Sequence, residues 1–189
     1  MRFLYELNSE EIKKVFYENR NNYIATAILK HKNTPTELLL KNTNNYNIVQ
    51  NIYLKDEVYE KILKEKYECI VSMACRVSHT PIWFLEKALE IFPNNYDVEY
   101  SIARLLDRKL TDNLYKKLSL SSRWEVRSCI AKNKCVPKKY LSELQNDIDS
   151  RVLISVKDRL NESDYNMGIK NWRDVPQLKI NIERDVLCS

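Results

Sequence analysis

Glycine is almost absent from this sequence, since Gly168 is the single glycine among 189 residues. Glycine is the residue that most readily takes positive φ, which tight β-hairpin turns and phosphate-cradling loops require. The sequence therefore argues against a hairpin-rich β protein and against enzymes that hold phosphate on a glycine-rich loop. Leucine, isoleucine, lysine and glutamate are abundant instead, and these residues favour an all-α fold.

Long apolar runs are absent as well. No stretch approaches the roughly 20 apolar residues of a transmembrane helix. The apolar start of the chain is too short, and too soon followed by acids, for a signal peptide. The five cysteines are an odd number without the spacing of a disulfide framework, which is typical of reduced, cytosolic proteins. We therefore expect a cytoplasmic protein with no membrane segment.

What the sequence does contain is a recurring unit of two short apolar helices separated by a turn. Repetition of this kind predicts an array of stacked units rather than a single globular core. The turns at Thr34-Pro35, Thr80-Pro81 and Val136-Pro137 each place proline where a second helix begins. Apolar spacing predicts helices at 24–31, 68–77, 81–91, 98–106, 125–132 and 138–146, with no sheet. Asn8, with Glu11 three residues later, predicts the capped start of a first helix.

The units can be aligned on one position of the first helix. Leu29, Ile52, Ala74, Ala103 and Ala131 fall at this position, 23, 22, 29 and 28 residues apart. Small or medium side chains would let paired helices approach closely, so we expect all five to be buried. In the turn before the second helix, Thr34 is expected to cap the helix N-terminus.

The extent of the apolar repeat predicts that the chain is divided into three regions. Residues 1–22 form an N-terminal capping helix, 23–160 the repeat array and 161–189 a C-terminal cap. Within the last region, Asn161 is expected to cap a short helix that Gly168 closes. Caps with a polar outer face keep the ends of a repeat array soluble.

The most regular unit reads VRSCIAKNKCVP over 126–137, followed by DIDSRV over 147–152. This unit resembles the leucine-rich-repeat-variant family, whose pattern runs V-R-x-x-V-A-x-N-P-x-T-P and then D-x-D-x-x-V-R. Val126-Arg127, Ala131, Asn133 and Pro137 match it. Lys134 replaces the first proline of the pattern, and Arg151-Val152 inverts the second Val-Arg.

The resemblance implies a HEAT-like, right-handed α-solenoid of about five to six short helical pairs with terminal caps. Some members of this family carry a cysteine-rich iron–sulfur module at the N-terminus. Here no cysteine precedes Cys69, so the resemblance implies no such cluster, and we expect no cofactor and no bound metal.

Groups able to do chemistry are few. Cys69 and Cys75, like Cys129 and Cys135, are six residues apart, so on a helix they do not face one another as metal ligands do. We interpret them as small buried apolar residues. His31 and His79 lie in inter-helix turns, where they serve either as proton-transfer groups or as capping groups. Acidic pairs such as Glu86 and Glu90 fit a solvated helix face.

The uneven distribution of charged residues is the functional signal that stands out from the rest of the sequence. Between residues 104 and 139 there are eleven Lys and Arg against three acidic residues, a net charge of +8 in a chain whose total is +5. The candidate binding residues, called the basic stripe below, are Arg104, Arg108, Lys109, Arg123, Trp124, Arg127, Lys132, Lys134, Lys138 and Lys139. Arg127 follows a core residue, so we expect it to point outward near Lys132 and Lys134. Trp124 is either a base-stacking or a packing residue.

These patterns favour a non-enzymatic scaffold, an adaptor or inhibitor, that binds another macromolecule on a curved surface. A protein with an acidic surface is the first partner we expect. Sequence-independent nucleic-acid binding through the same stripe is the alternative. A HEAT-like DNA glycosylase is a third reading, which requires an acid and aromatic residues at one concave site.

Overall fold

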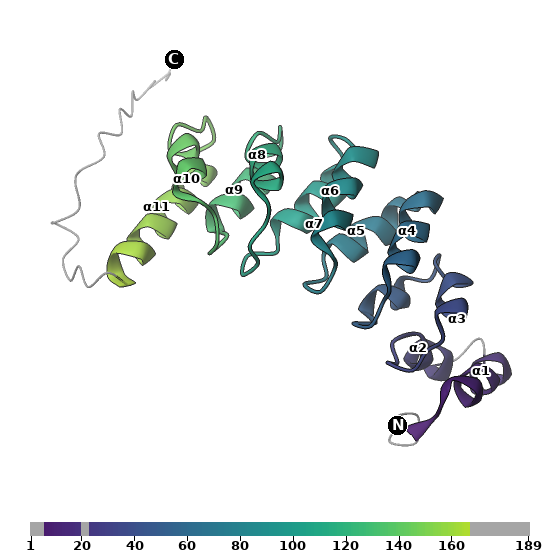
Figure 1. The fold of residues 1–189 in the computed structure, drawn as a ribbon. Coiled ribbons are helices and arrows are strands. Elements are labelled where there is room, and N and C mark those ends of the chain that lie inside the picture. Colours follow the sequence, from purple (N-terminus) through teal and green to yellow (C-terminus); the bar gives the residue numbers. More distant parts are fainter. Residues whose placement is uncertain (1–5, 20–22, 167–189) are drawn as a thin grey trace, which may run out of the picture.

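The computed structural model describes residues 6–19 and 23–166, and these are helical without any strand (Figure 1). The elements are α1 (Ser9–Glu18), α2 (Tyr23–Leu29), α3 (Thr36–Leu40), the 3-10 helix η2 (Tyr46–Gln50), α4 (Asp56–Glu65), α5 (Glu68–Cys75), α6 (Ile82–Ile91), α7 (Tyr96–Ala103), α8 (Asp112–Ser119), α9 (Trp124–Lys132), α10 (Lys138–Leu144) and α11 (Ser150–Asn166). The prediction of an all-α protein is confirmed for this part of the chain.

The helices form two rows in a curved, elongated array. Successive members of the inner row, α2, η2, α5, α7, α9 and α11, pack against one another. In the outer row α4 packs against α3 and α6, and α10 packs against α8. Figure 1 shows the inner row along the concave side of the bend and α1 beside α2 at one end. Each element contacts near neighbours in sequence, as expected when short units stack.

One apolar core runs between the two rows. Leu29, Ala74, Ala103 and Ala131 are at most 1% exposed, so these four predicted positions are confirmed. Ile52 is 62% exposed, and its predicted burial is wrong. Its unit begins with a 3-10 helix that ends at Gln50. The tighter turn places Ile48, Val49 and Asn51 inside and leaves Ile52 in the following turn, facing solvent.

The polar residues at or just before the helix N-termini have two different roles. Asn8 caps α1 through a reciprocal capping box with Glu11, as predicted. Thr34 is not a cap, because Pro35 holds that position and Thr34 instead donates its hydroxyl hydrogen to the carbonyl oxygen of Ile28. Thr80 does the same to Ala74 at 2.6 Å. The Thr-Pro pair therefore closes the end of the preceding helix as well as beginning the next one.

Two further predicted features differ from the structure, one in the middle of the chain and one near its C-terminal end. The helix expected over 98–106 ends at Ala103, and Leu105 is buried in the loop that follows. Asn161 does not cap a short helix, because it lies within α11, which continues to Asn166. Gly168 and the rest of the region expected to form a C-terminal cap lie outside the described residues.

Two buried asparagines, Asn51 and Asn133, each join their unit to the one before it. The side-chain amide of Asn51 donates to the carbonyl oxygens of Leu29 and His31 at 3.1 and 3.0 Å. Asn133, in the unit with the family-like motif, donates to Leu105 and Arg108 at 2.8 and 3.0 Å. These bonds supply donors to carbonyls at and just after the ends of inner-row helices, and the carbonyls of His31 and Leu105 also accept from backbone N–H groups.

Candidate macromolecule-binding surface

The residues of the basic stripe lie in three different environments. Its members divide among exposed residues of the inner row, a buried ion pair, and the turns leading to the outer row. Arg104, Arg123 and Lys132 are exposed and Trp124 is half-buried at or beside α7 and α9. Lys109, Lys134, Lys138 and Lys139 are exposed in the turns before α8 and α10 or in the first turn of α10.

Arginine and tyrosine side chains stack along the inner-row helix α7. Tyr96 and Tyr100 are one helical turn apart, and their rings lie nearly parallel with centroids separated by 5.3 Å. The guanidinium carbon of Arg104 lies 5.7 Å from the Tyr100 centroid, and that of Arg123 lies 5.8 Å from the Tyr96 centroid. Attraction between a cation and the face of an aromatic ring favours this arrangement. Two cations therefore flank a pair of stacked rings.

Neither of these two arginines has an acidic partner among the described residues. Their guanidinium groups take part in no ion pair and no hydrogen bond there. Glu125 acts electrostatically on Tyr96, and burial is the main cause that raises the pKa of the Tyr96 hydroxyl. The guanidiniums of Arg104 and Arg123 are thus fixed by the rings and retain their hydrogen-bonding capacity.

Trp124 continues this surface onto α9. The guanidinium carbon of Arg151 lies 3.5 Å from the centroid of the Trp124 ring, and the ring also packs against the apolar core. Arg151 is itself held by the carboxylate of Asp149 at 2.7 Å. This arrangement favours the interpretation of Trp124 as a packing residue over its use as a base-stacking platform. We call Tyr96, Tyr100, Arg104, Arg123, Trp124 and Arg151 the arginine–aromatic surface.

The outward orientation predicted for Arg127 is wrong. Its Nε and Nη2 donate to the two carboxylate oxygens of Asp147 at 2.6 and 2.8 Å, and Nη1 donates to the carbonyl oxygen of Ser121 at 2.8 Å. The side chains of Arg127 and Asp147 are only 12% and 6% exposed. Burial of a charge is tolerated when a partner of opposite charge and further hydrogen bonds compensate it. Arg127 is therefore a structural residue.

The remaining stripe residues differ in how their charge is balanced. Lys134 pairs with Asp107 at 2.6 Å and Lys139 with Asp112 at 2.5 Å, both at the surface. Lys109, Lys132 and Lys138 form no ion pair with any described residue. Arg108 is half-buried in the turn between α7 and α8, where partial burial lowers its pKa.

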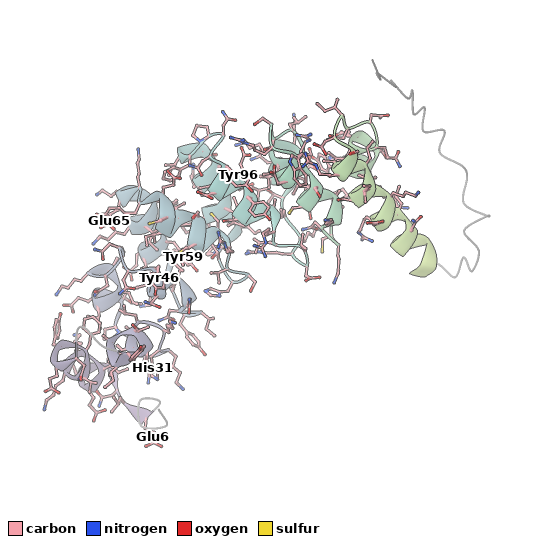
Figure 2. The ribbon with its side chains drawn as sticks, turned by 180° about the vertical axis from the view of Figure 1, so that it is seen from behind. Glu6, His31, Tyr46, Tyr59, Glu65 and Tyr96 are labelled. Carbon is pink, nitrogen blue, oxygen red and sulfur yellow. The ribbon has the colours of Figure 1, made fainter. Side chains whose placement is uncertain are left out.

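One aromatic residue stands at the start of each inner-row element from α2 to α9. These residues, called the aromatic row, are Tyr23, Tyr46, Tyr67, Tyr96 and Trp124. Figure 2 labels Tyr46 in the N-terminal half of the array and Tyr96 farther along. Tyr23, Tyr46 and Tyr67 are 94%, 51% and 48% exposed, and no Lys or Arg of the described chain covers their rings. The positions of aromatics at unit starts can be read from the sequence, but the exposure of each ring cannot.

The histidines act locally in their turns. The Nδ1 atom of His31 accepts a hydrogen bond from the backbone N–H of Asn33 at 3.1 Å. His79 interacts with the backbone carbonyls of Val49 and Asn51 in the preceding unit. Burial is the main cause that lowers the pKa of both imidazoles. His31 therefore closes a turn, and His79 also links two units.

The other candidates for chemistry are dispersed. Cys75 is buried, and burial raises the pKa of its thiol and of the half-buried Cys129 thiol. Cys69 and Cys135 are exposed, so the prediction that all four are buried is wrong for these two. Cys69 lies in the first turn of α5, and Cys135 lies in the turn between α9 and α10. Across residues 6–19 and 23–166 no three His, Cys, Asp or Glu side chains gather in a way that could hold a metal ion.

Comparisons with known proteins give no match to a family model, a curated protein or a solved structure. Among the helices described, none is long and apolar enough to cross a membrane.

Proposed function

We propose that this protein is a right-handed α-solenoid of about five to six units with capped ends, which acts as a non-enzymatic scaffold. It binds a protein with an acidic surface and serves as an adaptor or inhibitor. The proposal is supported by two rows of short helices that curve together and by the inner row along the concave side. Curved arrays of this kind present long surfaces to large partners.

The arginine–aromatic surface is the observation that carries the proposal. Arg104 and Arg123 are exposed, stacked on Tyr100 and Tyr96, and not paired with any acid of the described chain. Stacking restricts the rotamers of a long side chain, so less conformational entropy is lost when it binds a carboxylate. Arginine and tyrosine are also the residues that most often dominate the energetics of protein interfaces.

The distribution of charge favours a protein over a nucleic acid. Residues 23–103 contain nine Lys and Arg against ten acidic residues, so the N-terminal half of the array is close to neutral. A phosphate backbone would need cations along the whole surface that it follows. An acidic patch on a folded partner needs them only where it makes contact, and here they are concentrated between residues 104 and 139.

Single-stranded nucleic acid remains the second candidate because of the aromatic row. The rings of Tyr23, Tyr46 and Tyr67 are exposed and are not covered by Lys or Arg of the described chain. Bases stack on such rings without sequence preference. A short strand would then meet the tyrosines at one end and the arginines at the other.

A base-excising enzyme is the third candidate, and the observation that bears on it is Glu125. This carboxylate acts electrostatically on Tyr96 and Arg151, so an acid does lie among aromatic residues of the inner row. The arginines that cover Tyr96 and Trp124 would have to move before a base could stack there. Release of a damaged base from duplex DNA, abolished by Glu125→Gln, would establish this activity in place of the scaffold.

Charge reversal separates the first two candidates. The variant Arg104→Glu/Arg123→Glu is compared with Lys109→Glu/Lys138→Glu, which changes the net charge equally at exposed sites elsewhere. Each protein is used in pulldowns from its native cell, with and without nuclease, and in titrations with a fluorescent polyglutamate peptide and a single-stranded oligonucleotide. Nuclease-resistant capture and peptide binding that only the arginine variant loses are the expected result. Oligonucleotide binding with a steep salt dependence, or equal losses in both variants, would contradict the proposal.

A further inference from the structure

An aromatic residue followed directly by an acid recurs at one position of three successive units. The three pairs are Tyr67-Glu68, Tyr96-Asp97 and Trp124-Glu125. Each aromatic residue lies seven residues before the aligned alanine of its unit, which is Ala74, Ala103 or Ala131. The pairs stand at the N-terminal ends of α5, α7 and α9, and these helices are neighbours in the inner row (Figure 1). Three units therefore carry a ring and a carboxylate at equivalent positions.

Arginines of the following unit cover two of these three rings. The guanidinium carbon of Arg123, the residue before α9, lies 5.8 Å from the centroid of the Tyr96 ring. That of Arg151, near the start of α11, lies 3.5 Å from the centroid of the Trp124 ring. The face of an aromatic ring attracts a cation, and the planar guanidinium also stacks on it. This position therefore holds an arginine wherever the following unit supplies one.

The third ring, that of Tyr67, has no such cover. Tyr67 is 48% exposed, whereas the two covered rings are half-buried, and no Lys or Arg of the described chain lies over it. The reason lies in the next unit, where Asn95 stands before α7 at the position that Arg123 holds before α9. Asn95 caps α7 instead, because its side-chain oxygen accepts from the backbone N–H of Val98 at 3.1 Å.

Glu68 places an uncompensated negative charge beside the open ring. Its side chain is exposed and forms no ion pair with any described residue. Residues 23–103 contain ten acidic residues against nine Lys and Arg, so this part of the array has no excess of positive charge that would repel a cation. The open position at Tyr67 is therefore suited to a guanidinium from another molecule.

We propose that Tyr67 and Glu68 receive an arginine side chain of the protein partner, next to the acidic patch that binds Arg104 and Arg123. The inference rests on the scaffold function proposed above and adds that the partner surface is of mixed charge. The guanidinium stacks on the Tyr67 ring, as Arg123 does on Tyr96, and donates its N–H groups to the Glu68 carboxylate. Packed helices are roughly 10 Å apart, so a linker of about three residues joins an arginine on Tyr67 to an acidic run on Arg123.

Fluorescence anisotropy titrations with labelled, amidated peptides test this contact. A polyglutamate peptide is extended through a short glycine linker, at either end, with arginine or with citrulline, which keeps the planar shape but has no charge. The chain carries a net charge of +5, so the added positive charge alone weakens long-range attraction. A preference for arginine therefore requires a local contact. We expect the wild type to bind the better arginine peptide about fivefold more tightly than its citrulline counterpart, from the usual strength of an exposed cation–π contact and ion pair.

Matched variants locate the contact. Tyr67→Ala and Glu68→Gln should each lower the preference for arginine, and the double variant should abolish it. Tyr53→Ala and Glu60→Gln, which remove the same groups at other exposed positions, should retain the wild-type preference. If Tyr67→Ala does not fold, Glu68→Gln carries the comparison. An equal loss in the control variants would overturn the inference.

Failure of this contact is distinguishable from failure of the scaffold proposal. If polyglutamate binds through Arg104 and Arg123 but the wild type does not prefer arginine to citrulline, the contact at Tyr67 is wrong and the scaffold proposal stands. If no peptide binds, N-acetyl-arginine methylamide is titrated into the wild type and the ring signals of Tyr67 are followed by NMR. We expect a shift that the citrulline analogue does not produce, and unchanged Tyr67 signals would overturn the inference by themselves.

Discussion

Arg127 donates two hydrogen bonds to the carboxylate of Asp147, from Nε at 2.6 Å and from Nη2 at 2.8 Å. The pair links α9 to the turn that precedes α11, and a third bond from Arg127 reaches the carbonyl oxygen of Ser121. Hydrogen bonding by Arg127 is the main cause that lowers the pKa of the Asp147 carboxyl. A single guanidinium thus connects α9 to the turn before it and to the turn that precedes α11.

Arg127→Ala is expected to lower the free energy of unfolding by about 3–5 kcal/mol, because it leaves the nearly buried Asp147 charge without a partner. Urea unfolding monitored by circular dichroism measures this loss. Lys139→Ala, which breaks the exposed pair with Asp112, is the control and should cost less than about 1 kcal/mol. Equal losses in the two variants would contradict the structural role of Arg127.

Asn133→Ala is expected to destabilise the fold by at least about 2 kcal/mol, because it removes the amide donations to the carbonyls of Leu105 and Arg108 and the side-chain oxygen that accepts from the Tyr115 hydroxyl. Asn133→Asp keeps the oxygen that accepts from Tyr115 but loses both amide donations, so it should also be destabilising. The exposed Asn113 of α8 provides the control. If Asn113→Ala shifts the urea midpoint as far as Asn133→Ala does, the proposed linkage between units is wrong.

Local periodicity was enough to predict α2, α5, α6, α7, α9 and α10 and the burial of four of the five aligned core positions. The burial of Ala74, Ala103 and Ala131 follows from apolar spacing that each helix repeats. The predicted burial of Ile52 is wrong because η2 is a 3-10 helix. A sequence stretch of five residues is too short to distinguish the period of a 3-10 helix from that of an α-helix. The sequence shows where each repeat unit begins, but it does not show whether the first helix of the unit is an α-helix or a 3-10 helix.

The candidate site depended on long-range pairing, which composition does not reveal. In the sequence, the eleven basic residues between 104 and 139 are equally good candidates for binding a partner. In the structure, Arg127 is buried against Asp147, which lies 20 residues later in the chain. Arg123 lies over Tyr96 of the preceding unit. Which cation is paired, stacked or exposed depends on the register between units, and that register is set by loop lengths that vary along the chain.

Acidification is expected to destabilise the protein between about pH 7 and pH 5. Burial lowers the pKa of His31 and His79 in the folded state, so below the ordinary histidine value of about 6.5 the unfolded chain binds more protons. Stability is therefore complete above that value and declines as pH falls towards the folded pKa. Melting temperatures recorded across this range test the sign. His79→Gln should make the decline shallower, and an unchanged slope would exclude His79 as a contributor.

Charge reversal of exposed residues should spare the fold, whereas reversal of Arg127 should not. Arg104 and Lys132 are exposed and have no acidic partner in the described part of the chain. Arg104→Glu/Lys132→Glu should therefore shift the melting temperature little, since exposed charges contribute little to folding. Adding Arg127→Glu places a second anion beside the nearly buried Asp147, and the triple variant should unfold at a markedly lower temperature. Differential scanning calorimetry of both variants at one salt concentration gives the comparison. Equal melting temperatures would mean that Arg127 is as dispensable to the fold as the exposed cations, and a low value for the double variant would mean that Arg104 or Lys132 has a structural role.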